Sequence, residues 1–262
     1  MNGFFGNLKT MCAAGALGLA SVAGVQAAPI TVGGVTWDPD NVNDYSSQAV
    51  NMRQFINGTT GELTGFGIVT VINGTGSATF CVSGCELTFQ FSGFTPVGQQ
   101  FVPTIGSNIQ YTGGSIRFYV DSSPDVVNPF DYNSLTFANT GDGVLWLDLV
   151  GNGTNTGGVT FIGSAFGTPG GAYTLLAGGG KTDVTGSGLA DSYFNYNTLA
   201  DGSDVSFSTS LTFFQQGNLN PADVSGTGNI RSDTRVEVPE PGSLALVGLA
   251  MMGLFGARRL RS

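Results

Sequence analysis

Residues 86–94 read ELTFQFSGF, and the alternation in this stretch decides the fold class. Leu87, Phe89 and Phe91 occupy every second position, with Thr88 and Gln90 between them. Successive side chains of a β-strand point to opposite faces, so a period of two places the apolar residues together on one face. The stretch therefore predicts a half-buried strand that turns its apolar face towards a core.

The same alternation recurs along the chain and predicts an all-β protein. Clear examples are residues 114–121 (GSIRFYVD), 143–151 (GVLWLDLVG) and 204–215 (DVSFSTSLTFFQ). Weaker strands are expected at residues 30–37, 63–72, 159–166 and 172–177. Asn-Gly, Asp-Gly and Gly-Gly pairs separate the segments, as in hairpin turns. About eight to ten such strands without a fixed repeat predict one antiparallel β-sandwich or jelly roll, at residues 28–217.

The composition is that of a packed protein. The 262 residues include 42 Gly and 10 Pro, together about a fifth of the chain, whereas disordered low-complexity chains reach about 25–30%. Charged residues make up 10% and aromatic residues 11%, the opposite of the balance seen in disordered chains. We therefore expect a sizeable hydrophobic core.

The charge distribution argues against one class of partner and excludes several kinds of catalysis. Between residues 28 and 237 the chain has 17 carboxylates and five basic side chains. Phosphate backbones repel such an acidic body, so nucleic acid is not an expected partner. The chain contains no histidine, which excludes Ser-His-Asp and Cys-His catalysis and the commonest metal ligand. Acid–base chemistry would fall to carboxylates or tyrosines.

The N-terminus has the pattern of a secretory signal peptide at residues 1–27. Lys9 precedes an apolar run at residues 11–25, which is shorter than the roughly 20 residues of a membrane-spanning helix. Val25 and Ala27 place small residues three and one positions before a cleavage site between Ala27 and Ala28. The sequence therefore predicts an exported protein whose signal helix is removed.

A second apolar run, at residues 243–257, is followed at once by Arg258 and Arg259. As a helix it would reach about 22 Å, less than the hydrocarbon core of about 30 Å. Arginines in this position stay on the cytoplasmic side, so the run predicts a short transmembrane helix that holds the chain at the inner membrane. Residues 218–237 have few large apolar side chains and are interpreted as the linker to this segment.

Three parts stand in order at residues 238–262: a proline-containing motif, the apolar run and an arginine pair. The residues of the first and last parts are Val238, Pro239, Glu240, Pro241, Arg258 and Arg259. The arrangement resembles the PEP-CTERM sorting signal of Gram-negative bacteria. The resemblance implies recognition by an exosortase, a transpeptidase-like enzyme of the inner membrane that removes the tail near the Pro-Glu-Pro motif.

The body resembles flocculation-associated members of the same group. The resemblance lies in residues 61–74 (GELTGFGIVTVING), 81–91 (CVSGCELTFQF) and 113–121 (GGSIRFYVD). It implies a protein of the cell surface or extracellular matrix that takes part in biofilm or floc formation. Extracellular polysaccharide is the partner that follows from this resemblance.

Cys81 and Cys85 lie directly before the strand at residues 86–94. In an exported protein two cysteines this close are expected to form a disulfide. The entropy model gives such a short loop about 2 kcal/mol of stabilisation. A thioredoxin-like motif would need two intervening residues and a βαβ setting, neither of which the sequence shows.

Two groups of aspartates are candidates for Ca²⁺, although no metal is assigned. They are Asp38, Asp40 and Asp44, and Asp121, Asp125 and Asp131. Oxygen-rich loops suit Ca²⁺, but the first group departs from the EF-hand pattern at its fifth and sixth positions. Asp and Asn also gather in turns because their side chains bond to the nearby backbone. Both interpretations of these aspartates are kept, as Ca²⁺ ligands and as turn residues.

The alternation in residues 143–151 places Leu145, Leu147 and Leu149 on one face and Trp146 on the other. Trp37 and Trp146 would stack on sugar rings if exposed, although Trp146 would instead join the core if it faced a second sheet. The choice depends on which face of the strand is buried.

These observations favour a non-enzymatic, exported structural or adhesive protein without a cofactor. The alternative is a secreted enzyme acting on polysaccharide, which would need two carboxylates about 5–10 Å apart in a cleft. A self-assembling structural subunit is a third hypothesis and would present an exposed strand edge.

Overall fold

The computed structural model describes residues 27–98, 105–131, 133–154, 156–167, 173–212 and 223–233. Ala28–Val236 forms one compact unit. The expected N-terminal signal helix and C-terminal transmembrane helix fall outside the described residues. Within the described ranges, no helix combines the length and the apolar character needed to cross a lipid bilayer.

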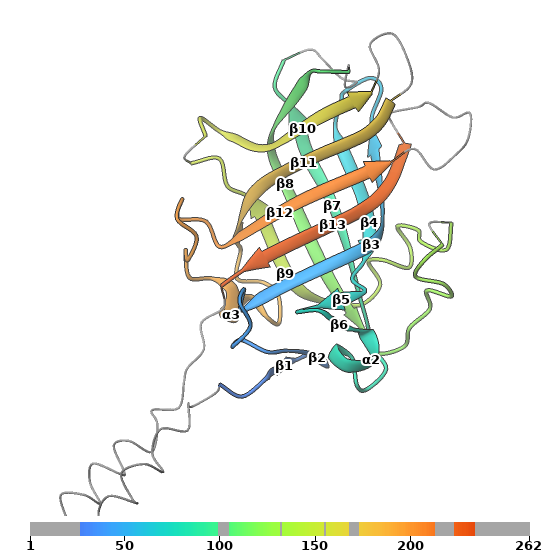
Figure 1. Cartoon of the computed structure of the whole chain (residues 1–262), viewed down its shortest axis with the longest axis vertical. Coiled ribbons are helices and arrows are strands. Elements are labelled where there is room, and N and C mark those ends of the chain that lie inside the picture. Colours follow the sequence, from blue (N-terminus) through green and yellow to red (C-terminus); the bar gives the residue numbers. More distant parts are fainter. Residues whose placement is uncertain are drawn as a thin grey trace, which may run out of the picture. The chain divides into compact units, whose positions relative to one another are not determined.

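Eight antiparallel strands form a wall that closes into a barrel (Figure 1). In order around the wall they are β3 (Tyr45–Ile56), β4 (Leu63–Ile68), β7 (Glu86–Pro96), β8 (Asn108–Asp121), β10 (Val159–Gly167), β11 (Tyr173–Val184), β12 (Val205–Thr212) and β13 (Asp223–Ser232). The wall closes because β13 pairs with β3 over nine residue pairs, from Asp223 opposite Phe55 to Ser232 opposite Tyr45.

A ninth strand, β9 (Val144–Gly151), shares its wall position with β10. Residues 108–112 of β8 pair with β10, whereas residues 115–120 of β8 pair with β9. β11 also pairs with both strands. β9 and β10 therefore act as one wall strand, interrupted by residues 152–158.

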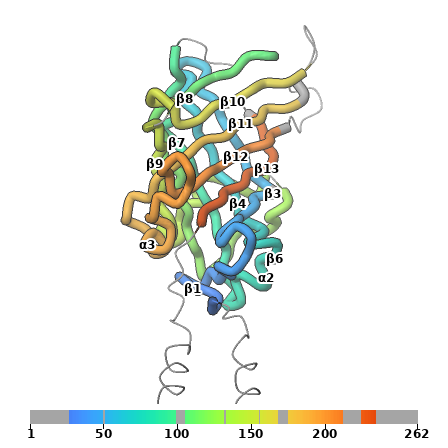
Figure 2. The backbone as a smooth tube through the Cα atoms, turned by 60° about the vertical axis from the view of Figure 1, so that its left-hand side comes forward, coloured from blue at the N-terminus to red at the C-terminus, as the bar shows by residue number. Residues whose placement is uncertain are grey.

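Short elements gather at one end of the barrel (Figures 1 and 2). They are β1 (Ile30–Val32), β2 (Val35–Trp37), β5 (Val71–Ile72), β6 (Thr75–Gly76), α2 (Ser77–Phe80) and α3 (Asp191–Phe194). Trp37 of β2 and Phe194 of α3 pack together with ring centroids 5.7 Å apart. These elements cover that end with aromatic side chains.

The antiparallel all-β class is confirmed, but the expected sandwich or jelly roll is wrong. The strands follow one another around a single closed wall instead of dividing between two sheets. Alternation cannot separate the two architectures, because strands of both have one inward and one outward face.

The interpretation of residues 218–237 as a linker is also wrong for Asp223–Ser232, which is the closing strand β13. Val224 and Ile230 are its buried apolar residues. Between them, a Cβ on Gly226 would lie 2.3 Å from the carbonyl oxygen of Ser210, and one on Gly228 would lie 2.8 Å from Met52 Sδ. This strand packs through its backbone, so it lacks the large apolar side chains that mark the others.

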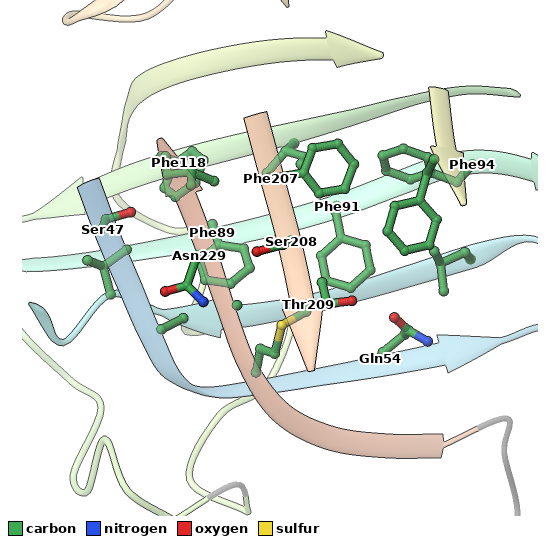
Figure 3. Close-up of a pocket in the computed structure, with 18 residues that line it drawn as sticks. Ser47, Gln54, Phe89, Phe91, Phe94, Phe118, Phe207, Ser208, Thr209 and Asn229 are labelled. Atoms are coloured by element: carbon green, nitrogen blue, oxygen red, sulfur yellow. The ribbon is translucent and has the colours of Figure 1, made fainter. Parts of the chain in front are cut away.

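Aromatic rings in the core lie over glycines of neighbouring strands. A Cβ on Gly67 would lie 2.4 Å from Cζ of Phe89, and one on Gly65 would lie 2.3 Å from Cζ of Phe91. On another part of the wall, Phe161 of β10 lies over Gly178 of β11 in the same way, also on the core side. Figure 3 shows the rings of Phe89 and Phe91 in the lining of an interior cavity of about 40 Å³. The interior of this eight-stranded barrel is thus filled by side chains.

The segment between β8 and β9 covers part of the outer wall. Leu135 packs on outward-facing Phe66 and Ile68 of β4. The hydroxyl of Thr88 donates to the carbonyl of Thr140 at 3.0 Å, and the side chain of Gln90 donates to the carbonyl of Phe137 at 2.6 Å. Thr88 and Gln90 face away from the core as expected, but a folded-back loop buries Thr88 and half-buries Gln90.

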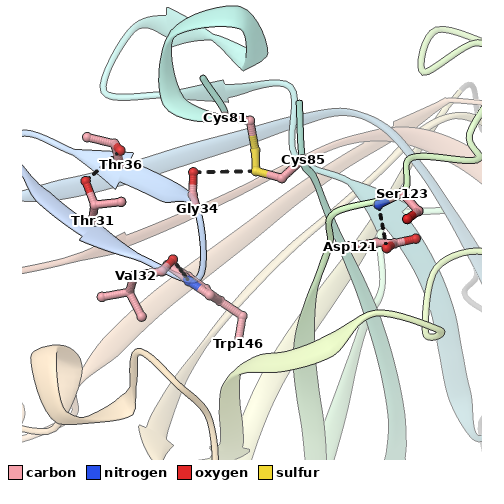
Figure 4. Close-up of a disulfide and its surroundings, with 9 residues drawn as sticks. All are labelled: Thr31, Val32, Gly34, Thr36, Cys81, Cys85, Asp121, Ser123 and Trp146. Carbon is pink, nitrogen blue, oxygen red and sulfur yellow. Dashed lines mark hydrogen bonds between the residues drawn. A yellow bond between two sulfur atoms is a disulfide. The ribbon is translucent and has the colours of Figure 1, made fainter. Parts of the chain in front are cut away.

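Trp146 is fully buried, which is the core alternative left open for it, and the adjacent Leu147 is fully buried as well. The pairing of β8 with β9 shifts between Phe118 and Tyr119, which breaks the period of two. The indole Nε1 of Trp146 donates to the carbonyl of Val32 at 2.9 Å (Figure 4). Since Trp37 is also buried, neither tryptophan offers a surface for stacking on sugars.

Candidate functional site on the outer wall

A groove of about 580 Å³ lies on the outside of the barrel, over β10, β11, β12 and β13. Ile162 of β10, Ser208 of β12 and Asn229 of β13 belong to its lining. Asn152 and Thr156 contribute from the loop between β9 and β10. It is more spacious than the cavity of about 40 Å³ in the barrel interior.

The groove is hollow because small side chains line its middle. The pairing of the strands places three residues in one row across the wall, namely Gly179 of β11, Ser208 of β12 and Asn229 of β13. The neighbouring row contains Lys181 and Ser206, followed by an arginine on β13. Glycine and serine leave open space between longer side chains on either side. The surface presents hydroxyl and amide groups beside apolar surface such as that of Ile162.

Two of the five basic residues of the body line this groove, namely Lys181 and Arg231. Ser206 of β12 is the register partner of both residues, of Lys181 on one side and of Arg231 on the other. The two basic residues therefore lie two strands apart, which corresponds to roughly 10 Å at the usual strand spacing. Lys181 Nζ lies 3.5 Å from Oδ2 of Asp201. Among the described residues, no carboxylate forms an ion pair with Arg231.

Asp201 is held in the ionised state by its neighbours. The hydroxyl and backbone N–H of Ser203 donate to its Oδ1, and Lys181 lies beside Oδ2. The Ser203 hydroxyl, above all, lowers the pKa of Asp201 below its usual value. Asp201 is also the one carboxylate among the described residues that line the groove. A pair of acid–base carboxylates across the groove is therefore missing from this described lining.

The expected disulfide between Cys81 and Cys85 is present, with the two Cα atoms 5.1 Å apart. It closes the turn that follows α2 and leads into β7. Cys85 Sγ also lies 3.6 Å from the carbonyl oxygen of Gly34 (Figure 4). The ring therefore packs against the hairpin formed by β1 and β2.

Three of the six aspartates considered for Ca²⁺ accept hydrogen bonds typical of turns. Oδ1 of Asp38 accepts from the backbone N–H of Asp40 at 3.0 Å, and Oδ1 of Asp121 accepts from that of Ser123 at 2.8 Å (Figure 4). Asp131 makes the same contact with the backbone two residues on. Across the described ranges, no three His, Cys, Asp or Glu side chains are arranged to hold a metal ion.

The residues of the two terminal signals are largely outside the described part of the chain. Of the cleavage pair, Ala27 is buried and Ala28 is exposed. The sorting residues are outside the described ranges, namely Val238, Pro239, Glu240, Pro241, Arg258 and Arg259. Their assignment depends on sequence comparison.

Sequence reasoning did not find the groove, although two signals bear on it. Lys181 is the only lysine after the N-terminal leader, and it follows three glycines in the segment AGGGK. Ser206, Ser208 and Ser210 occupy the outward positions of a strand that was identified correctly. What was missing is the neighbour relation between β11, β12 and β13, which only the closed wall supplies.

Comparison with known proteins identifies the C-terminal segment. Residues 237–261 match the family model described as the PEP-CTERM protein-sorting motif. No match was found among curated proteins or among solved structures. The match covers the motif, the apolar run and the arginine pair, as the sequence predicted. Residues 237–261 are therefore a PEP-CTERM sorting motif, which indicates an exported protein that an exosortase sorts at the membrane.

Proposed function

We propose that the barrel is a non-enzymatic adhesive component of the extracellular matrix and holds polysaccharide in the groove on its outer wall. Export and sorting bring the barrel to the cell surface, where hydrated polysaccharide is an available partner. The observation that carries this proposal is the groove of about 580 Å³ with its hydroxyl, amide and cationic lining.

The chemistry of the lining suits sugar hydroxyls. Ser208 and Asn229 offer donors and acceptors side by side, so a sugar can exchange its bonds to water for bonds to the protein. Ile162 is 41% exposed and adds an apolar surface for the carbon side of a sugar ring. Such a surface binds by many weak contacts along a chain, and adhesion to a polymer gains from repetition.

A polysaccharide-cleaving activity is less well supported by this groove. Asp201 is its one carboxylate among the described residues, and Asp201 is paired with Lys181. Hydrolysis of a glycosidic bond needs two carboxylates in different protonation states. We therefore favour binding without cleavage.

Self-assembly through strand edges is also less well supported. The eight wall strands pair on both sides, so the described wall has no free edge. Edges remain at the short strands of the two-stranded hairpin β1–β2 and at β6. Strands of two or three residues give little backbone for pairing between copies.

Blocking the groove tests the proposal. In Ser208→Trp a large side chain fills the middle of the groove from an exposed position. The control Ser210→Trp places the same side chain two residues further along β12, at an exposed position outside the lining. The exported protein, purified from producing cells, is co-sedimented with exopolysaccharide from the same cells. We expect S208W to lose binding and S210W to retain it, with matching thermal unfolding curves.

The same variants can be examined in cells. A strain that produces only S208W should aggregate as poorly as a strain lacking the gene, and a strain with S210W should aggregate like the wild type. Equal sedimentation of S208W and wild-type protein, together with unchanged aggregation in the deletion strain, would refute the proposed function.

A further inference from the structure

We propose that the groove selects anionic polysaccharide, bearing carboxylates such as those of uronic acids, through Arg231 and Lys181. This inference rests on the proposed function and names its ligand class. It starts from the position of positive charge on a strongly acidic body. The described lining holds Lys181 and Arg231 beside one carboxylate, so the charges of the lining sum to a positive value although the body carries 17 carboxylates.

Arg231 is the side chain best placed to hold a carboxylate. Its position on β13 is exposed, and no carboxylate within the described ranges forms an ion pair with it. A guanidinium presents its donors in a planar fork that matches the two oxygens of a carboxylate. Ser206 lies between Arg231 and Lys181 in the same cross-strand row and can bond to neighbouring sugar hydroxyls.

Lys181 has a different role because Asp201 already faces it. The 3.5 Å contact between Lys181 Nζ and Asp201 Oδ2 offsets the charge of the lysine. A carboxylate on the ligand therefore competes with Asp201 for Lys181, while Asp201 repels that same carboxylate. Asp201 thus restrains the affinity for anionic chains, and its removal should strengthen their binding.

The test uses two polymers that share one sugar backbone and differ in the esterification of their carboxyl groups, and so in charge. Polygalacturonate carries a carboxylate on every sugar, and its fully methyl-esterified form carries none. The exported protein from producing cells is titrated with each polymer at low and high salt. We expect tighter binding of polygalacturonate at low salt and a smaller difference at high salt, because salt screens exposed charges.

Charge variants then identify the residues responsible. Arg231→Gln should weaken polygalacturonate binding roughly fivefold and leave the esterified polymer unaffected. Lys181→Gln should weaken polygalacturonate binding less than Arg231→Gln does, because Lys181 is already paired with Asp201. Asp201→Asn should strengthen polygalacturonate binding. Arg53→Gln is the matched control, because Arg53 faces outward on β3 over the ring of Phe55, outside the groove.

The outcomes separate this inference from the proposed function. Equal binding of both polymers, with R231Q and R53Q alike, would overturn the selection of anionic chains. If S208W still abolished that binding, polysaccharide adhesion would stand and the anionic preference would fail alone. Absence of binding to either polymer would also overturn the inference, and co-sedimentation with the native exopolysaccharide would then decide the proposed function separately.

Discussion

Replacing Gly67 with Ala tests whether ring-over-glycine packing determines the stability of the barrel. A Cβ at residue 67 would lie 2.4 Å from Cζ of Phe89 and 2.9 Å from Cβ of Met52. Gly67 is not among the residues with positive φ, so the cost is steric. Phe89 and Met52 line the cavity of about 40 Å³, so the ring can move only part of the way. Overpacking of this kind predicts a loss of about 1–3 kcal/mol in the free energy of unfolding.

Guanidinium denaturation with the disulfide intact measures this loss, followed by the fluorescence of the two buried tryptophans. Gly58→Ala is the matched control, because a Cβ there meets no atom within 4 Å. Its free energy of unfolding should change by less than about 0.5 kcal/mol.

A double variant shows whether the ring is the cause. Phe89→Leu removes the ring, so the combination of G67A with F89L should lose less stability than the sum of the two single losses, by about 1 kcal/mol or more. A G67A protein as stable as G58A, or a double variant with an additive loss, would refute the packing argument.

Three further predictions concern the titration of a carboxylate, the disulfide and the tail. Burial raises the pKa of Glu86, despite the opposing hydrogen bond from the backbone N–H of Val126. The contribution of Glu86 to the free energy of unfolding is therefore full below about pH 4.3 and is lost as the pH rises through the raised pKa. E86Q should therefore lose less stability than the wild type between about pH 4 and about pH 7, and an identical pH profile would contradict this. Replacing both Cys81 and Cys85 with Ser should cost about 2 kcal/mol in the free energy of unfolding, and an unchanged denaturation midpoint would show that the ring does not constrain the unfolded chain. In cells with the exosortase, the intact mass of the native product should be that of a chain without residues 243–262. In cells without the exosortase, it should include these residues. A retained tail in both would contradict processing.

The sequence was most informative where alternation is unbroken. Residues 86–94 and 204–212 form wall strands with the expected inward side chains. It missed β3, whose pairing with β13 shifts register and whose inward residues include Ser47 and Gln54. It also missed β13, because glycines at Gly226 and Gly228 take the place of apolar side chains. Period-two patterns reveal strands with regular side chains, and bulges and glycines remove that signal.

The groove was out of reach for a different reason. Lys181 and Arg231 are 50 positions apart in the sequence and become neighbours only through the register of β12 with both of their strands. Neither residue belongs to a local motif. By contrast, the disulfide and the sorting signal are short-range patterns, and both were identified from spacing and composition.

Three consecutive glycines, Gly178–Gly180, connect the core to the groove. A Cβ on Gly178 would lie 2.2 Å from Cζ of Phe161, so this glycine admits a core ring, whereas a Cβ on Gly179 would point to the groove and come no closer than 3.2 Å, to the carbonyl oxygen of Phe207. Gly178→Ala should therefore lower the free energy of unfolding by about 1–3 kcal/mol. Gly179→Val should lower it by less than about 1 kcal/mol and prevent binding of polysaccharide, because its side chain fills the groove. Denaturation and co-sedimentation of the two variants decide between the roles. If G179V were as unstable as G178A and still bound the matrix, the glycine run would serve the core alone and the hollow of the outer wall would have no part in adhesion.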